Sequence, residues 1–286
     1  MKWQRGSRSR NLEDRRGMRV RRVPPVGRGG IGLGGIAILI VLSLLFRQDL
    51  TSMLGLVVDD GSPAADMNVA SDPEEELLVD FVSFVLDDAQ DTWAALLPQL
   101  GMTYREARLV LFRDEVSSAC GFAQAASGPF YCPGDEKVYI DLSFFDELKR
   151  RFGAPGDFAQ AYVLAHEIGH HVQKVVGTSS EVRRAQQQRP DLANELSVRL
   201  ELQADCYAGV WGNSTARRDL LQHGDVEEGL AAASAVGDDR IQRQATGRVN
   251  PDAFTHGSSA QRVEWFRRGM ATGDPRTCDT FAGAGD

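Results

Sequence analysis

The spacing of apolar and polar positions divides the chain into helical and extended segments. Residues 157–176 carry alanine, valine, leucine and isoleucine at helical spacing, between a start signal at Asp157 and a stop signal at Gly177. Further helices are predicted at 71–96, 143–152, 194–211, 225–236 and 258–269, and strands at 108–113 and 137–142. The pattern therefore predicts an α+β domain that is mainly helical and has a small β-sheet.

The helix predicted at 157–176 contains the pattern H-E-x-x-H, from His166 to His170. Residues four apart lie on one helical face, so the two imidazoles can bind one metal ion with Glu167 beside it. The alternative is a helix with two surface or core histidines. Gly169 argues against that alternative, because a glycine inside a helix costs about 1 kcal/mol relative to alanine. Its presence predicts a close approach by another backbone or by the metal site.

A catalytic zinc ion keeps three protein ligands and one open position, so a third ligand is expected from another segment. Glu201 and Asp205 lie four apart on the apolar helix predicted at 194–211. We expect Glu201 to coordinate Zn²⁺ and Asp205 to accept the remaining N–H of His166. The alternative is a solvated acidic face, which is the more common environment of these residue types.

This combination resembles the gluzincin metallopeptidases, which pair H-E-x-x-H with a downstream glutamate ligand and an aspartate four residues later. Roughly residues 75 to 280 are similar to the bacterial neutral zinc metallopeptidase family. The runs that carry this resemblance are Cys120-Gly121, 128–133, 138–145, 166–171, 201–211 and 254–257. The resemblance implies a zincin-like fold with an edge strand along the cleft. It also implies hydrolysis of peptide bonds by a zinc-activated water, with Glu167 as general base and a peptide or protein as substrate.

A further candidate comes from the same resemblance. The run from Thr255 to Arg262 resembles the H-P-x-x-x-x-R element of membrane-linked gluzincins, with Gly257 in place of proline. By this resemblance His256 is a catalytic residue that donates to the developing oxyanion. The alternative is a histidine that caps the helix beginning near Ser258. Arg262 either pairs with an acidic group of the site or has a structural role.

The charge distribution sets the amino-terminal region apart from the rest of the chain. Residues 1–28 carry a net charge of +8, so the remaining residues carry −16 of the total of −8. An acidic body argues against nucleic acid as a partner. The 18 residues 29–46 are uncharged, which is within the length that crosses a bilayer.

These features predict a domain organisation and a location. We expect a disordered basic cytoplasmic tail at 1–28, a transmembrane signal anchor at 29–46, a flexible linker at 47–70 and a zinc metallopeptidase domain at 71–286. By the positive-inside rule the amino terminus is cytoplasmic and the catalytic domain is extracytoplasmic, on a single-pass anchor in the cell membrane.

The four cysteines are an even number in a domain that is expected to be exported, which predicts disulfides. Four cysteines allow three pairings. Cys120 and Cys132 close a short loop, which favours their pairing and leaves Cys206 with Cys278. Free thiols are the alternative if the domain faces the cytoplasm.

Two other functions fit parts of the sequence. One is a catalytically inactive, zinc-stabilised binding module tethered to the membrane, against which Glu167 argues because a structural zinc site needs no base. The other is a scaffold whose basic tail binds anionic lipid or nucleic acid.

Overall fold

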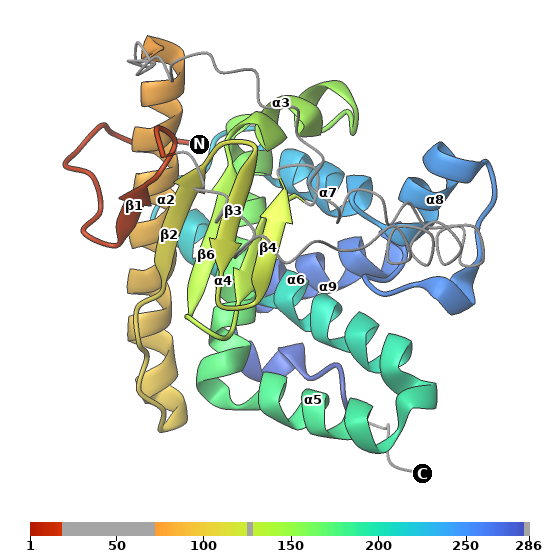
Figure 1. Ribbon diagram of the computed structural model, residues 1–286. Coiled ribbons are helices and arrows are strands. Elements are labelled where there is room, and N and C mark those ends of the chain that lie inside the picture. Colours follow the sequence, from red (N-terminus) through yellow and green to blue (C-terminus); the bar gives the residue numbers. More distant parts are fainter. Residues whose placement is uncertain (19–71, 125–127, 283–286) are drawn as a thin grey trace, which may run out of the picture. The chain divides into compact units, whose positions relative to one another are not determined.

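The computed structural model describes residues 1–18, 72–124 and 128–282. The predicted membrane anchor at 29–46 and the predicted linker at 47–70 lie outside these residues. The described residues form an α+β unit that is mainly helical, as predicted (Figure 1).

The main sheet has four strands in the order β1-β2-β6-β5. Its strands are β1 (Leu12–Asp14), β2 (Arg108–Phe112), β5 (Phe130–Cys132) and β6 (Lys137–Asp141). Strands β1, β2 and β6 are parallel to one another. Strand β5 lies at one edge of the sheet and pairs antiparallel with β6. Strands β2 and β6 are apolar and almost wholly buried, as is typical of parallel strands covered on both faces. Strands β3 (Glu115–Ser118) and β4 (Gly121–Gln124) form a separate hairpin.

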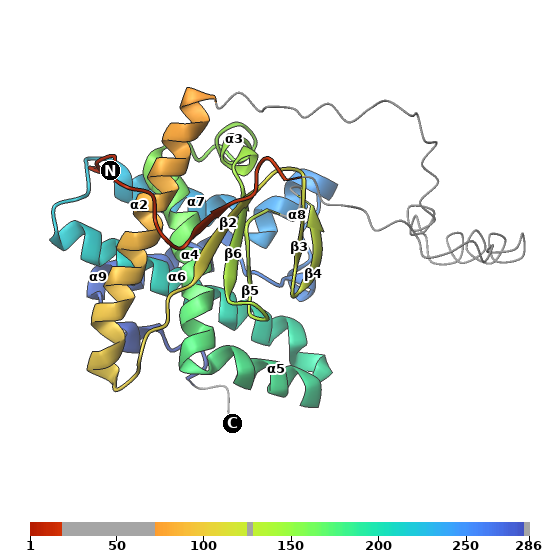
Figure 2. The same cartoon turned by 60° about the vertical axis from the view of Figure 1, so that its left-hand side comes forward.

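The helices pack around one central helix, α4 (Asp157–Val176), which contacts α2, α6 and α7 as well as β5 and β6. It runs behind the sheet in Figure 1, and Figure 2 shows α6 and α9 on its far side from the strands. The other helices are α2 (Pro73–Leu96), α3 (Ser143–Arg150), α5 (Thr178–Gln188), α6 (Ala193–Arg217), α7 (Asp225–Ala235), α8 (Asp238–Thr246) and α9 (Ser259–Thr272). Helices α5 and α8 are not among the helices predicted from the sequence.

Glycines allow the central helices to approach one another closely. A Cβ at Gly169 of α4 would lie 2.9 Å from the carbonyl oxygen of Ala204 on α6. A Cβ at Gly269 of α9 would lie 1.9 Å from the carbonyl oxygen of Cys206. The close backbone approach predicted from Gly169 is therefore confirmed, and it brings α6 against the helix that carries the H-E-x-x-H pattern.

The prediction that residues 1–28 are disordered is wrong for residues 1–18. Strand β1 pairs in parallel with β2, and the indole of Trp3 lies 5.3 Å from the ring of Phe81 on α2. Arg8 pairs with Asp80 at 2.8 Å, and Arg16 pairs with Glu75 at 2.9 Å. Three arginines of this segment, Arg5, Arg8 and Arg16, thus pair with acidic residues of α2, an arrangement that the local charge pattern could not reveal.

This packing also corrects the predicted topology. A single crossing at 29–46 would place residues 1–18 and the domain on opposite sides of a membrane, whereas the two form one folded unit. A cytoplasmic amino terminus together with an extracytoplasmic domain is therefore incompatible with the fold. Of the residues that the structure describes, none belongs to a helix long and apolar enough to cross a bilayer.

We expect probes in the two segments to report the same side of the membrane. Ser7 and Gln187 are both exposed, so Ser7→Cys and Gln187→Cys can each be labelled in intact cells with a membrane-impermeant maleimide. Both should react or both should be protected, with labelling after detergent lysis as the control for reactivity. Reaction of only one variant before lysis would contradict the shared location.

Candidate metal centre

Three predicted ligands converge where α6 crosses α4. The Nε2 atom of His166 lies 3.2 Å from one carboxylate oxygen of Glu201, and the Nε2 atom of His170 lies 3.3 Å from the other. Helix α4 supplies the two imidazoles on one face, and α6 supplies the carboxylate through the close contact at Gly169. The structure therefore brings together residues that are 35 positions apart in the chain.

This donor set fits a zinc ion. In a tetrahedral site with metal–ligand bonds of about 2.0–2.1 Å, neighbouring ligand atoms lie roughly 3.3 Å apart. The Nδ1 atoms of both histidines are engaged elsewhere, that of His166 with Asp205 at 2.9 Å and that of His170 with Gln173 at 2.9 Å. Nδ1 of each histidine is thus occupied and Nε2 is the atom left to bind a metal, in the arrangement that second-sphere acceptors commonly impose on ligating histidines.

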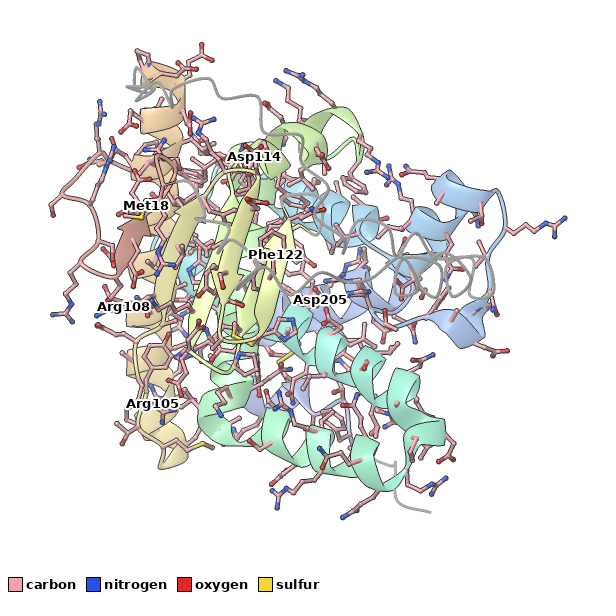
Figure 3. The ribbon with its side chains drawn as sticks, in the orientation of Figure 1. Met18, Arg105, Arg108, Asp114, Phe122 and Asp205 are labelled. Atoms are coloured by element: carbon pink, nitrogen blue, oxygen red, sulfur yellow. A yellow bond between two sulfur atoms is a disulfide. The ribbon has the colours of Figure 1, made fainter. Side chains whose placement is uncertain are left out.

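Asp205 is the centre of a buried hydrogen-bond network behind His166. It is 0% exposed and lies on α6, where Figure 3 labels it. Since a carboxylate only accepts, His166 donates through Nδ1 to Asp205, which also accepts from the hydroxyl of Tyr162. Arg262 of α9 donates two hydrogen bonds to the carboxylate of Asp205, from Nε at 2.8 Å and from Nη2 at 2.9 Å. The predicted contact between Asp205 and His166 is present, and Arg262 pairs with an acidic group of the site.

The electrostatics of the centre favour a cation. Burial by itself lowers the pKa of His166, but Asp205 and Glu201 outweigh burial and raise this pKa to about 9. Burial raises the pKa of Glu201, but the two histidines lower it well below its usual range. The carboxylates of Glu201 and Asp205 thus face one guanidinium, that of Arg262, so the site favours either protonated imidazoles or a cation in their place.

The convergent ligands open into a cleft of about 660 Å³. Glu167 lines this cleft together with His166, His170 and Glu201. The edge strand β5 contributes Phe130 and Tyr131 to the wall. Aromatic and aliphatic side chains cover much of the remaining surface, namely Phe144, Phe152, Val163, Val236 and Ile241. The cleft wall thus combines the edge strand β5 with the three convergent ligands.

His256 lies at the cleft wall and outside the ligand set. Its side chain is 52% exposed, and its Nδ1 atom lies 3.2 Å from Asp238. Asp238 also accepts backbone N–H groups from Thr255, His256 and Gly257. The hydrogen bond to Asp238 raises the pKa of His256, although burial opposes this effect. The structure therefore places His256 near the site, and a catalytic role for it stays a prediction.

Two functional candidates were missed or misjudged from the sequence. His171, the residue after His170, is 0% exposed and bonds Tyr131 at 3.0 Å and the carbonyl of Arg105 at 2.6 Å. It thereby connects α4 to the cleft strand β5. Gln173, three positions after His170, is also fully buried. A glutamine in a helix whose other buried positions are mostly apolar was the signal in the sequence that could have pointed to this residue.

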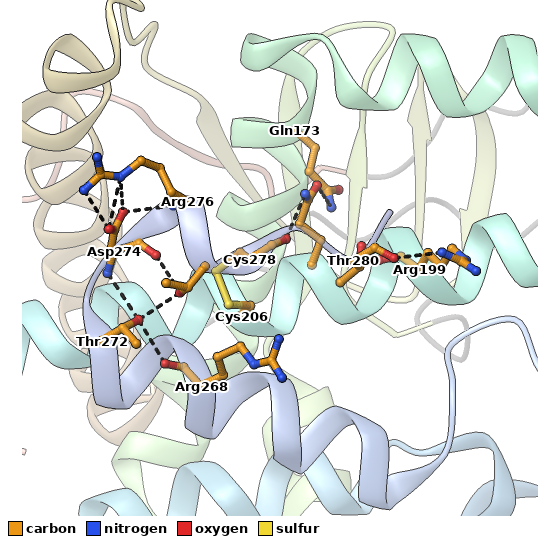
Figure 4. Close-up of a disulfide and its surroundings, with 11 residues drawn as sticks. Gln173, Arg199, Cys206, Arg268, Thr272, Asp274, Arg276, Cys278 and Thr280 are labelled. Carbon is orange, nitrogen blue, oxygen red and sulfur yellow. Dashed lines mark hydrogen bonds and ion pairs between the residues drawn. A yellow bond between two sulfur atoms is a disulfide. The ribbon is translucent and has the colours of Figure 1, made fainter. Parts of the chain in front are cut away.

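Both disulfides have the pairing that loop length favoured. Cys120 pairs with Cys132, and Cys206 pairs with Cys278 across 72 positions. The second disulfide joins α6, one residue after Asp205, to the carboxyl-terminal segment (Figure 4).

Comparison with known proteins places the whole chain in one group. A family model described as "Putative neutral zinc metallopeptidase" matches residues 1–281. The uncharacterized protein YpfJ of Escherichia coli strain K12 is 46% identical over 290 residues, covering 98% of this chain and 99% of YpfJ. The uncharacterized protein Rv2575 of Mycobacterium tuberculosis strain H37Rv is 48% identical over 203 residues, covering 67% of each chain. No solved structure gives a significant match.

Proposed function

Since the chain belongs to the neutral zinc metallopeptidase family, we propose that it hydrolyses peptide bonds with Zn²⁺ held by His166, His170 and Glu201. The single observation that carries this proposal is the convergence of these three ligands with Glu167 on one cleft. A structural zinc site is closed and has four protein ligands. Here the described residues supply three ligands at the floor of an open cleft, together with a carboxylate that can act as a base.

The residues of the cleft have distinct roles in this proposal. When bound, Zn²⁺ supplies Lewis acidity, which lowers the pKa of water and polarises a carbonyl group. Glu167 accepts the proton of the attacking water and passes it to the leaving amine nitrogen. Strand β5 binds the substrate in an extended conformation through the edge that pairs with no other strand among the described residues. His256, oriented by Asp238, donates a hydrogen bond to the oxyanion of the tetrahedral intermediate.

Removal of the metal should abolish activity reversibly. We expect the purified full-length chain to contain one zinc ion and to cleave a peptide library, and a chelator should remove both. Added Zn²⁺ should restore cleavage. His170→Ala should lose zinc and activity, whereas His223→Ala, which alters a histidine outside the cleft, should keep both. Cleavage that persists after metal analysis shows complete removal of zinc would contradict the proposal.

The location is proposed on separate grounds. Two disulfides within the described residues are typical of an oxidising compartment. We propose that residues 1–18 and the domain lie together in such a compartment, and that the apolar run at 29–46 associates with the cell membrane. The peptide or protein substrate would then be extracytoplasmic.

A further inference from the structure

Gln173 makes a set of contacts that joins both ligand-bearing helices. Its Oε1 atom lies 2.9 Å from Nδ1 of His170, and its Nε2 atom lies 2.6 Å from the carbonyl oxygen of Leu200. Leu200 immediately precedes Glu201, the ligand on α6. Gln173 is 0% exposed, so no water competes for these bonds. One side chain therefore contacts an imidazole ligand and the backbone beside the carboxylate ligand.

The hydrogen-bond pattern fixes the direction of every donor. A backbone carbonyl only accepts, so the amide NH₂ of Gln173 must face Leu200 and its oxygen must face His170. His170 consequently carries a proton on Nδ1, and Nε2 is the ring nitrogen that faces Glu201. The same NH₂ donates at 3.1 Å to Oε1 of Gln203, whose own NH₂ donates at 3.0 Å to the carbonyl of Cys278.

The carbonyl oxygen of Cys278, the last acceptor in this series of hydrogen bonds, is held in place by the carboxyl-terminal segment. Cys278 is bonded to Cys206 on α6, and Thr280 donates to the carbonyl of Arg199 at 2.7 Å (Figure 4). Arg199 in return donates to the carbonyl of Thr280 at 3.1 Å. The disulfide and these two bonds fix residues 278–280 along α6. The position of the Cys278 carbonyl, and with it the orientation of Gln203, depends on this attachment.

We propose that Gln173 is a positioning residue for the metal site and that the Cys206–Cys278 disulfide supports it through Gln203. Gln173 sets the tautomer and ring orientation of His170 and holds α4 and α6 at the spacing that the ligands need. The inference rests on the zinc-binding part of the proposed function and is independent of the reaction.

Metal affinity of the full-length chain tests this role directly. We expect Gln173→Leu to weaken zinc binding by about 10- to 100-fold in competition with a chromophoric chelator, and to alter the visible absorption spectrum of the cobalt-substituted protein. Gln173→Glu keeps an acceptor for His170 and should bind zinc more tightly than Gln173→Leu. The matched control is Gln90→Leu, since Gln90 is also buried but lies on α2, away from the ligands.

The two disulfides provide a second comparison. The double variant Cys206→Ala/Cys278→Ala should weaken zinc binding, whereas Cys120→Ala/Cys132→Ala should not, because the hydrogen bonds of the Gln203 side chain within the described residues go to Gln173 and Cys278. Equal zinc affinity and an unchanged cobalt spectrum in Gln173→Leu and the wild type would overturn the inference. Failure of the wild type itself to bind zinc would instead overturn the metal site, so the two failures are distinguishable.

Discussion

Glu167→Gln is expected to reduce peptide cleavage by at least about 10²-fold while the protein keeps its zinc ion. General acid–base catalysis contributes typically 10²–10⁴-fold, and a neutral amide cannot accept the proton of water. Glu167 is outside the ligand set, so its replacement should leave metal binding intact. The amide has nearly the same shape as the carboxylate, and the cleft should therefore keep its form. Cleavage rate and zinc content measured on the same sample test this result.

Glu181→Gln is the control for this experiment. Glu181 is an exposed carboxylate on α5 that does not line the cleft, so its replacement should change neither cleavage nor zinc content. Full activity of Glu167→Gln would refute the assigned base. Loss of zinc from Glu167→Gln would show that the carboxylate helps to hold the metal, and the loss of activity would then say nothing about a base.

The second large effect is expected from Arg262→Met. Asp205 is 0% exposed, and Arg262 is its cationic partner through two nitrogen atoms. Burial raises the pKa of Asp205, but Arg262 and His166 outweigh burial and lower it, so the carboxylate is charged in the fold. Removing one partner of a buried ion pair typically costs about 3–5 kcal/mol. We expect the free energy of unfolding of the zinc-free protein to fall by about this amount, as measured with a chemical denaturant.

A neighbouring arginine provides the matched control. Arg268 lies on the same helix, but its side chain is 44% exposed and its ion pair with Glu264 is on the surface. Exposed pairs contribute about 0–1 kcal/mol, so Arg268→Met should have little effect on unfolding. In the double variant Arg262→Met/Asp205→Leu the uncompensated charge is absent, and part of the lost stability should return. Equal effects of Arg262→Met and Arg268→Met would contradict the buried network.

Local sequence patterns located the ligand-bearing segments. The start at Asp157 and the stop at Gly177 set the bounds of α4, and the spacing of His166 and His170 followed from helix geometry alone. Gly169 predicted a close neighbour, which is the backbone of Ala204. Strands β2 and β6 and helix α2 were also predicted close to their observed bounds. These features depend on residues only a few positions apart.

The contacts between distant segments were beyond the reach of these patterns. Strand β1 has three residues with no apolar alternation, and Arg8 and Arg16 on either side of it pair with acids about 60 or more positions later. Gln173 and His171 became informative only when Leu200 and Tyr131 were placed beside them. The position of His256 depends on Asp238, in a helix that the pattern did not predict.

The sequence by itself determined which residues can bind a metal, because helical periodicity fixes the relative directions of side chains within one segment. Only the tertiary structure decided how Glu201 and Asp205 meet the two histidines, what holds Asp205 and His170, and that residues 1–18 belong to the folded unit. The physical reason is that packing and charge pairing join segments without regard to their separation along the chain.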